Sequence, residues 1–155
     1  MDDWPDRKIR NNAEWYICKH AMHPESWRHT RLAKHHPDVI HRAVLQDGEL
    51  PIVSSYISDS SWYVLTTRRI IGAYAGDSVE LSATDVCSDK FGNFKGYGTA
   101  QTEVMALTNN GKRTSRLEYE TGKASMAPIY YFRFWSIKYP IINKLKDDPR
   151  ASKEA

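Results

Sequence analysis

The sequence has little cysteine, little net charge and no long apolar run. Its two cysteines, Cys18 and Cys87, are too few for a disulfide framework, and their positions match no metal-binding pair. The first ten residues, MDDWPDRKIR, lack the apolar core of a signal peptide, and no window approaches the roughly 18 apolar residues of a membrane span. We therefore expect a cytoplasmic protein that meets a membrane, if at all, from its surface.

The net charge of +3 and the pI near 8.8 are too small for a chain that tracks a phosphate backbone over its whole surface. We therefore expect no nucleic-acid partner. Catalytic motifs are missing too, because there is no G-x-S-x-G elbow, no phosphate loop and no acidic metal triad. Cys87 follows an apolar strand and is expected to be buried rather than nucleophilic. We expect no enzymatic activity and no cofactor.

What the chain does contain is enough apolar surface for one domain with a small extension. It is 41% hydrophobic, with five Trp, nine Tyr and four Phe among its 155 residues. The segment 1–47 reads as a helical extension rich in His and Trp. We expect helices from Asn12 to His23-Pro24, from Pro24 through Trp27 to Lys34, and from Pro37 to Gln46-Asp47-Gly48.

After residue 48 the pattern changes to short runs of β-branched and aromatic residues separated by polar turns. The runs predict seven strands, the spacing of a closed or nearly closed antiparallel barrel or a sandwich. The expected strands are Ile52–Ile57, Trp62–Leu65, Arg69–Tyr74, Ser78–Val86, Phe94–Thr99, Thr102–Leu107 and Thr114–Glu120.

The stretch IYYFRFWSIKYPIINKLKDD is apolar on nearly every face, and its length and position favour a helix that begins near Ala127 and kinks or restarts at Pro140. Ile141, Ile142 and Leu145 are expected on one side of it, and the tail 148–155 is expected to be flexible. Its aromatic residues are interpreted as the group that fills one mouth of the barrel. These are Tyr130, Tyr131, Phe132, Phe134, Trp135 and Tyr139.

Several short segments together carry a resemblance to a known family. The segments LQDGELP, YVLTTRRII and VELSATDV, followed by a late aromatic helix, resemble the bacterial pleckstrin-homology (PH) and GRAM-like domains over about residues 45–145. The resemblance implies an α+β fold in which 48–147 form a PH-like seven-stranded antiparallel bent barrel with a C-terminal capping helix. Relatives of that fold bind phosphoinositides, peptides or other proteins. The N-terminal helical extension is unmatched.

The polar step Thr66-Thr67-Arg68-Arg69 separates two apolar runs and has two interpretations. In the structural one, the Thr67 side chain hydrogen-bonds backbone groups of the turn, and Arg69 packs the aliphatic part of its side chain along the barrel. Arg68 alternates to the other face as a free arm, that is, a side chain without a partner in the fold. In the functional one, further cations converge on the same end of the barrel. Two sets are candidates for anion or lipid binding, and ordinary solvated charge is the alternative for both. They are Lys90 with Lys95, and Lys112 with Arg113 and Arg116.

All six histidines lie between Cys18 and His41. They include plausible zinc ligand types, but their spacing matches no established zinc motif and prolines interrupt the helices between them. We therefore expect no metal site and interpret the histidines as helix-surface and interface residues, with partner binding that is sensitive to pH near 6 to 7. Trp15, Trp27, His35 and His36, together with Arg68, are the candidate partner-binding residues.

These observations favour a non-enzymatic binding module that acts by stoichiometric protein–protein interaction. An immunity protein that neutralises a cognate bacterial toxin is the concrete form of that hypothesis. The alternative is peripheral binding of an anionic, phosphoinositide-like headgroup through the basic loops. A second alternative is a histidine-dependent metal enzyme.

Overall fold

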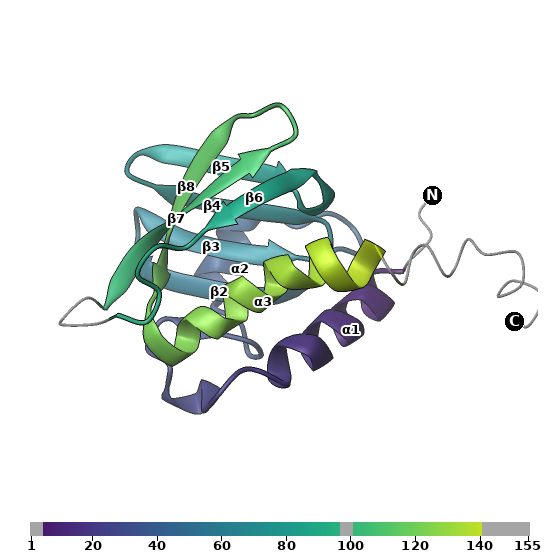
Figure 1. Ribbon diagram of the computed structural model, residues 1–155, viewed down its shortest axis with the longest axis horizontal. Coiled ribbons are helices and arrows are strands. Elements are labelled where there is room, and N and C mark those ends of the chain that lie inside the picture. The colour runs from purple at the N-terminus through teal and green to yellow at the C-terminus, as the bar shows by residue number, and fades with distance from the viewer. Residues whose placement is uncertain (1–4, 97–100, 141–155) are drawn as a thin grey trace, which may run out of the picture.

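The computed structural model describes residues 5–96 and 101–140, in which two antiparallel sheets pack against helices from both ends of the chain (Figure 1). The fold class is α+β, as the sequence predicts. The helices are α1 (Asp6–Cys18), α2 (Pro37–Ala43) and α3 (Met126–Arg133). The strands are β1 (Thr30–Arg31), β2 (Pro51–Ser58), β3 (Ser61–Thr66), β4 (Arg69–Tyr74), β5 (Asp77–Ser82), β6 (Val86–Lys90), β7 (Thr102–Asn109) and β8 (Thr114–Glu120).

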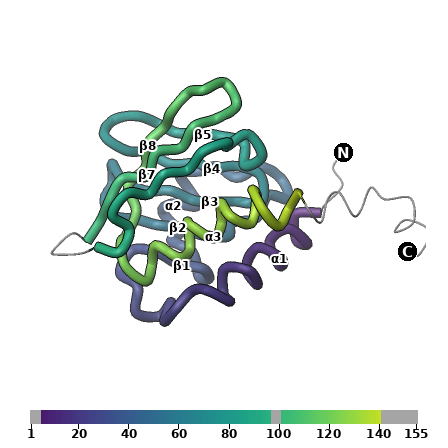
Figure 2. Tube along the Cα trace, in the orientation of Figure 1, coloured from purple at the N-terminus to yellow at the C-terminus, as the bar shows by residue number. Residues whose placement is uncertain are grey.

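The strands form two separate sheets, with order β1-β2-β3-β4-β5 in one and β6-β7-β8 in the other. Every neighbouring pair is antiparallel. The tube view shows β7 and β8 running obliquely across the larger sheet (Figure 2). In the described part of the chain the sheets do not join into a closed barrel.

Five of the expected strands are present close to their expected ranges, namely β2, β3, β4, β7 and β8. The expected strand Ser78–Val86 is wrong in its second half, because β5 ends at Ser82 and a 3-10 turn at Ala83–Asp85 redirects the chain into β6. The expected strand Phe94–Thr99 is wrong where it is described, since Phe94–Gly96 is a turn; its remaining residues lie outside the described ranges.

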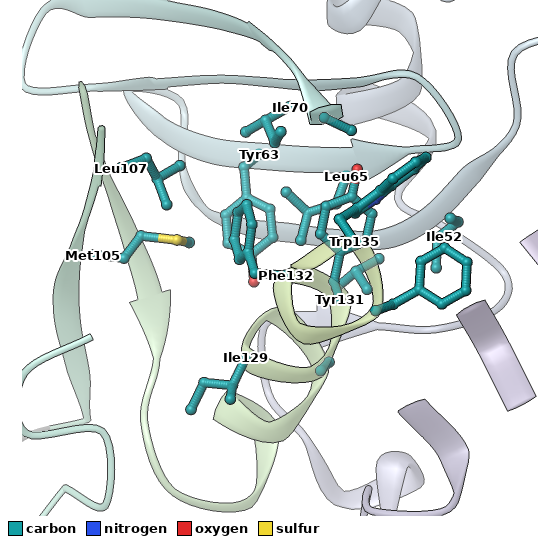
Figure 3. Close-up of a cluster of buried hydrophobic side chains, with 14 of the residues drawn as sticks. Ile52, Tyr63, Leu65, Ile70, Met105, Leu107, Ile129, Tyr131, Phe132 and Trp135 are labelled. Atoms are coloured by element: carbon teal, nitrogen blue, oxygen red, sulfur yellow. The ribbon is translucent and has the colours of Figure 1, made fainter. Parts of the chain in front are cut away.

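The main core lies between the sheets and α3, whose inner side chains point at the larger sheet (Figure 3). Tyr63 and Leu65 of β3 face Tyr131 and Phe132 of α3, and all four are buried. The Tyr131 hydroxyl donates to the Thr66 carbonyl at 2.6 Å, so the phenol has a partner in an otherwise apolar region. Of the six aromatic residues expected here, Tyr131, Phe132, Phe134 and Trp135 are buried in this core, whereas Tyr130 and Tyr139 are only partly buried.

β3 is buried on both faces, which explains why its sequence reads as an unbroken apolar run. Its alternate side chain Val64 joins Ile71 of β4 and Val39 and Ala43 of α2 in a second cluster on the outer face of the sheet. The expected helix from Pro37 is thus confirmed, and its apolar face docks as predicted. On the inner face, Gly72 of β4 permits the close approach of β8, because a Cβ there would lie 2.8 Å from Leu117.

Helix α1 starts six residues before the expected cap at Asn12. Asn12 lies inside the helix, where its side-chain amide donates to the Lys8 carbonyl at 2.8 Å. Pro5 precedes the first turn, and its fixed φ suits a helix start. Ile9, Ala13 and Ile17 lie on one face and belong to the main core, so the N-terminal extension packs as part of the same hydrophobic core as the sheets.

The second expected helix, through Trp27, is wrong. A single 3-10 turn at Pro24–Ser26 is followed by extended chain and by β1, which pairs with β2. The cause is a distant carboxylate, because Glu120 of β8 accepts the backbone N–H groups of Arg28, His29 and Thr30 at 2.8 to 3.1 Å. Three successive N–H groups bonded to one side chain are not available for a helix.

The C-terminal helix begins at Met126, one residue before the expected start, and continues from α3 through a π-helical turn at Phe134–Lys138. The described ranges stop at residue 140, so the predictions for Ile141, Ile142, Leu145 and the tail 148–155 lie outside them. No helix within the described ranges has both the length and the apolar composition needed to cross a membrane.

Candidate functional site

Helices α1 and α3 lie side by side (Figures 1 and 2), and a group of aromatic rings lies along the contact between them. The His20 ring stacks on Tyr130, with centroids 4.0 Å apart and planes 6° apart. Tyr16 meets both rings edge-on, at 5.4 Å from His20 and 5.6 Å from Tyr130. These are the offset and T-shaped geometries that aromatic pairs prefer, so the three rings hold one another in fixed positions.

Three cations lie over rings of the same region. Lys19 Nζ is 4.4 Å from the centroid of Trp15, and Lys138 Nζ is 5.4 Å from that of Tyr16. The guanidinium of Arg133 is 5.2 Å from the ring of Tyr130. Each cation–π contact at an exposed site contributes about 0.5–1 kcal/mol, enough to orient the cation without removing it from solvent. We call Trp15, Tyr16, Lys19, His20, Tyr130, Arg133 and Lys138 the α1–α3 face.

Exposure is uneven across this face and peaks at Trp15, whose relative exposure is 63%. Two of the other exposed large apolar residues flank the face in sequence, Met22 just after α1 and Ile137 in the π-helical turn. Glu14 is the acidic residue beside Trp15, and burial raises the pKa of its carboxyl. The face therefore combines exposed apolar surface with positive charge, which are the ingredients of a protein-binding hot spot.

Trp27 has a different environment from Trp15, although both were predicted to bind a partner. Its indole N–H donates to the Met22 carbonyl at 3.0 Å, and its ring packs against the main core. Trp27 is therefore mainly a packing residue in this structure. Trp15 is the more exposed of the two tryptophans.

The prediction that Arg68 is a free arm is wrong. Its guanidinium donates to both carboxylate oxygens of Asp6, at 3.0 and 2.8 Å, and also to Gln46 and the Asp47 carbonyl. The hydrogen bond from Arg68 lowers the pKa of Asp6. Arg68 thus joins the start of α1 to the β3–β4 turn.

Arg69 is used inside the fold, in keeping with the structural interpretation of this turn. Nη2 of Arg69 lies 2.6 Å from the fully buried Glu49 side chain, whose other oxygen accepts from Thr66 at 2.5 Å. Burial alone raises the pKa of Glu49, but the hydrogen bonds from Arg69 and Thr66 outweigh it and the net shift is downward. Thr66, rather than Thr67, satisfies the turn, because its hydroxyl accepts from the N–H groups of Arg68 and Arg69.

His35 and His36 face inward, and each uses one ring nitrogen within the chain. His35 Nδ1 lies 2.8 Å from the Ser54 hydroxyl, and His36 Nε2 donates to the His29 carbonyl at 2.7 Å, so this nitrogen carries the proton. Burial, reinforced by the neighbouring cations His36 and Arg31, lowers the pKa of His35 to about 4. Within residues 5–96 and 101–140, no three His, Cys, Asp or Glu side chains are grouped so as to hold a metal ion.

The two predicted basic sets lie at opposite ends of the β7–β8 hairpin. Lys95 precedes β7 and lines a cavity with Arg28 and Glu120, whereas Lys112 and Arg113 lie in the turn that joins β7 to β8. The eight residues of β7 separate them by roughly 25 Å at ~3.3 Å per residue. Lys90 ends β6 and pairs with Ala106, between the two ends. One small anion cannot contact both sets.

The set in the β7–β8 turn does line a cavity of its own, of about 290 Å³, between this hairpin and the β4–β5 hairpin. Arg113 contributes from the turn and Arg116 from β8, and Tyr74 and Asp77 contribute from the other side. Two guanidinium groups beside one carboxylate leave a net positive charge in this cavity. It is the place where the predicted anion-binding residues come together best.

Cys87, expected to be buried, is exposed. A register irregularity between Val86 and Ser88 displaces it from the regular ladder, and its thiol lies 3.3 Å from the Thr108 carbonyl. Nothing in the local residue pattern indicates this irregularity, because an apolar run before a cysteine is typical of a strand that continues into a core.

Of the α1–α3 face, only Trp15 was predicted from the sequence as a partner-binding residue. The i, i+4 spacing of Trp15 with Lys19, and of Tyr16 with His20, is a signal that could have indicated the rest of the α1 half. Tyr130, Arg133 and Lys138 were missed as surface residues, since the C-terminal stretch is apolar on every side and its spacing does not show which side meets α1.

No protein-family model matches this chain, and the search among curated proteins found no match. The argument for function therefore rests on the arrangement of the residues described above.

Proposed function

We propose that the chain is a non-enzymatic module that binds one protein partner stoichiometrically through the α1–α3 face. The single observation that carries the proposal is the exposed Trp15 ring with Lys19 over it, on a face where Lys138 and Arg133 lie over the rings of Tyr16 and Tyr130. A rigid aromatic anchor with oriented cations fits a folded partner whose surface is acidic and has an apolar centre. Neutralisation of a toxin by an immunity protein is the concrete role, because it requires occupancy and no chemistry.

We also propose that the scaffold is PH-like. The four strands β2–β5 lie in one antiparallel sheet and the three strands β6–β8 lie in the other. Helix α3 follows them in the sequence and packs on the core between the two sheets. This support comes from strand order and helix position. A bent barrel of this kind is a frequent carrier of protein-binding surfaces, which agrees with the proposed role.

The proposal is tested by affinity capture of the full tagged chain from its own cells, comparing three forms. Wild type and Val44→Ala should recover the same dominant partner, because Val44 is an equally exposed apolar residue on another surface, at 74% exposure. Trp15→Ala combined with Lys138→Glu should lose that partner, since it removes the anchor and reverses one charge. Retention by the double variant, or no stoichiometric partner with wild type, would overturn the proposal.

The immunity role has its own experiment. The captured partner is expressed alone and together with the chain in the same cells, and growth is measured. We expect the partner alone to stop growth and the chain to restore it, with the double variant failing to do so. A partner that does not impair growth contradicts the immunity role while leaving partner binding intact.

A second candidate function, binding of an anionic headgroup, is favoured by the cavity between the two hairpins that Arg113 and Arg116 line. We expect sedimentation with vesicles containing about 20% phosphatidylserine to fall steeply with salt if this function is present. Lys112→Ala with Arg113→Ala should abolish it, and Lys95→Ala should leave it unchanged because Lys95 lies at the other end of the hairpin. No sedimentation at low salt would rule this candidate out.

A further inference from the structure

β6 is the outermost strand of the smaller sheet, and among the described residues it has a paired neighbour only on the β7 side. A strand in this position presents unpaired backbone N–H and C=O groups along its other edge. Such an edge can accept another strand.

The register shows which groups of β6 point outward. The Asn109 N–H donates to the Arg113 carbonyl, so Asn109 and every second residue before it direct their backbone groups toward β8. The alternate residues of β7, including Thr108 and Ala106, therefore face β6, where they pair with Ser88 and Lys90. The residue between these two, Asp89, has its N–H and C=O directed away from the sheet.

A cavity of about 350 Å³ lies beside this edge, between the end of β6 and α3. Its apolar lining comes from Phe91, Phe94, Met126, Ile129 and Tyr130. Ile129 stands apart from the rest of the α3 side chains in Figure 3, on the side away from Trp135. The exposed charged residues Asp89 and Arg133 also line the cavity. Its volume is at the lower end of the range for ligand pockets and suits one large apolar side chain.

We propose that the outer edge of β6 accepts an extended peptide segment as an added strand, with one large apolar side chain of that segment in the cavity between β6 and α3. The outward backbone groups of Asp89 are placed to pair with an added strand, and the aromatic lining suits an apolar side chain on that strand. Arg133 and Lys90 favour an acidic residue next to that side chain.

A second copy of this chain fits the edge less well. An edge-to-edge dimer would bring Cys87, Asp89 and Lys90 of one copy to the same residues of the other, and these are exposed residues without a large apolar side chain for the cavity. A peptide segment supplied by another protein meets both requirements. This inference rests on the proposed function only in assuming a protein partner. The cavity shares Tyr130 and Arg133 with the α1–α3 face, but β6 and the exposed Trp15 are separate contacts.

The experiment uses the full chain and a phage-displayed library of random 12-residue peptides as the probe. Enriched peptides are synthesised and their dissociation constants measured by fluorescence polarisation. We expect them to share a large apolar residue with an acidic neighbour. Asp89→Pro should weaken binding about tenfold or more, because it removes the outward N–H while keeping the ladder bonds to β7, and proline is tolerated on the open side of an edge strand.

Asp89→Ala is the matched control, since it removes the same carboxylate but keeps the N–H. We expect its affinity to lie within about threefold of wild type. A second measurement does not depend on the folding of any variant: the bound peptide should slow hydrogen exchange of the Asp89 amide in the wild-type chain at least tenfold. Trp15→Ala should bind the selected peptides as wild type does.

Three results would overturn the inference. One is that no peptide is enriched over a scrambled control. Another is that peptides bind with unchanged exchange at Asp89 and equal affinity for both Asp89 variants. The third is a concentration-dependent dimer that Asp89→Pro abolishes, which would assign the edge to a second copy. Loss of the cellular partner on Trp15→Ala with no peptide binding would sink this inference while leaving the proposed function standing.

Discussion

The α1–α3 face and the region around the β3–β4 turn both combine cations with large side chains, but they use the cations differently. Around the turn, Arg68 and Arg69 are bonded to the carboxylates of Asp6 and Glu49. On the face, Lys19 and Arg133 lie over aromatic rings and remain exposed. A carboxylate satisfies an arginine with directed hydrogen bonds, whereas a ring only orients it.

The difference teaches where function is to be sought in this chain. The charged side chains of the turn region are bonded to other residues of the chain, so substitutions there should change stability. Charge on the face has little to do with stability and remains available to a partner. The predictions that follow measure this division, beginning with the largest expected effect.

Glu49→Gln should lower the free energy of unfolding by about 3–5 kcal/mol, because it leaves the guanidinium of Arg69 without its buried counter-charge. Glu80→Gln is the matched control, since Glu80 bonds the same arginine at 3.1 Å but is 66% exposed. It should cost less than about 1 kcal/mol. Urea unfolding at neutral pH measures both. Equal losses for the two variants would contradict the division between buried and exposed charge.

Lowering the pH should destabilise the protein through His35. Its pKa is about 4 in the folded chain against 6.5 as its ordinary value, so the unfolded chain binds the proton first as the pH falls. The stability that neutral His35 contributes is complete above pH ~6.5 and is lost progressively down to pH ~4, by up to about 3 kcal/mol. Urea unfolding of wild type and His35→Gln at pH 7.5 and 5.0 checks this.

The difference between wild type and His35→Gln isolates this residue, because the carboxylates are the same in both proteins. The variant should lose less stability between the two pH values than wild type does. His41→Gln, which replaces an exposed histidine on α2, should follow wild type throughout. Identical pH profiles for wild type and His35→Gln would show that His35 is not held neutral by its burial.

Replacing Trp27 should lower the stability of the protein much more than replacing Trp15. Trp27→Ala is expected to cost about 2 kcal/mol, because it removes packing against the main core and the hydrogen bond to the Met22 carbonyl. Trp15→Ala should cost less than about 0.5 kcal/mol, as a surface residue without buried partners. Thermal unfolding of both variants measures the difference. A comparable loss for Trp15→Ala would mean that its ring is part of the core rather than of a binding surface.

Val44→Gly should stabilise the protein by about 1 kcal/mol, the smallest of the expected effects. Val44 follows α2 with φ 51°, a left-handed conformation that a β-branched residue adopts only with strain. Val44→Ala removes the same exposed surface but keeps a Cβ, so its gain should be much smaller. If both variants have the stability of wild type, the strain at this position is negligible.

Much of the sheet could be predicted from the sequence, because β-branched and aromatic runs such as Trp62–Leu65 reflect local propensity and burial together. The helix from Pro37 was predictable for a similar reason, since Pro37-Asp38 starts it and its apolar spacing matches its docked face. The strand β6 was not, because its residues Cys87 to Lys90 are exposed at an edge and carry no apolar alternation.

The candidate sites were less predictable than the fold. Trp15 was predicted because several large tryptophan rings in a short helical extension exceed what that extension needs for its own packing. Arg68 was misjudged because its partner Asp6 lies 62 residues away, and nothing local signals that bond. Side-chain availability depends on such distant partners, so residue type alone does not separate a structural arginine from a binding one.

Glu120 has a consequence for how the chain acquires its structure during synthesis. Its carboxylate holds Thr30 across a separation of 90 residues. At ~5–20 residues per second, a ribosome takes roughly 5–20 s to make that intervening stretch. Until then the segment around Trp27 lacks the Glu120 carboxylate that holds it extended, and its residue pattern predicts a helix. The nascent chain therefore passes through an interval in which this segment is exposed to chaperones and proteases, and β8 ends that interval.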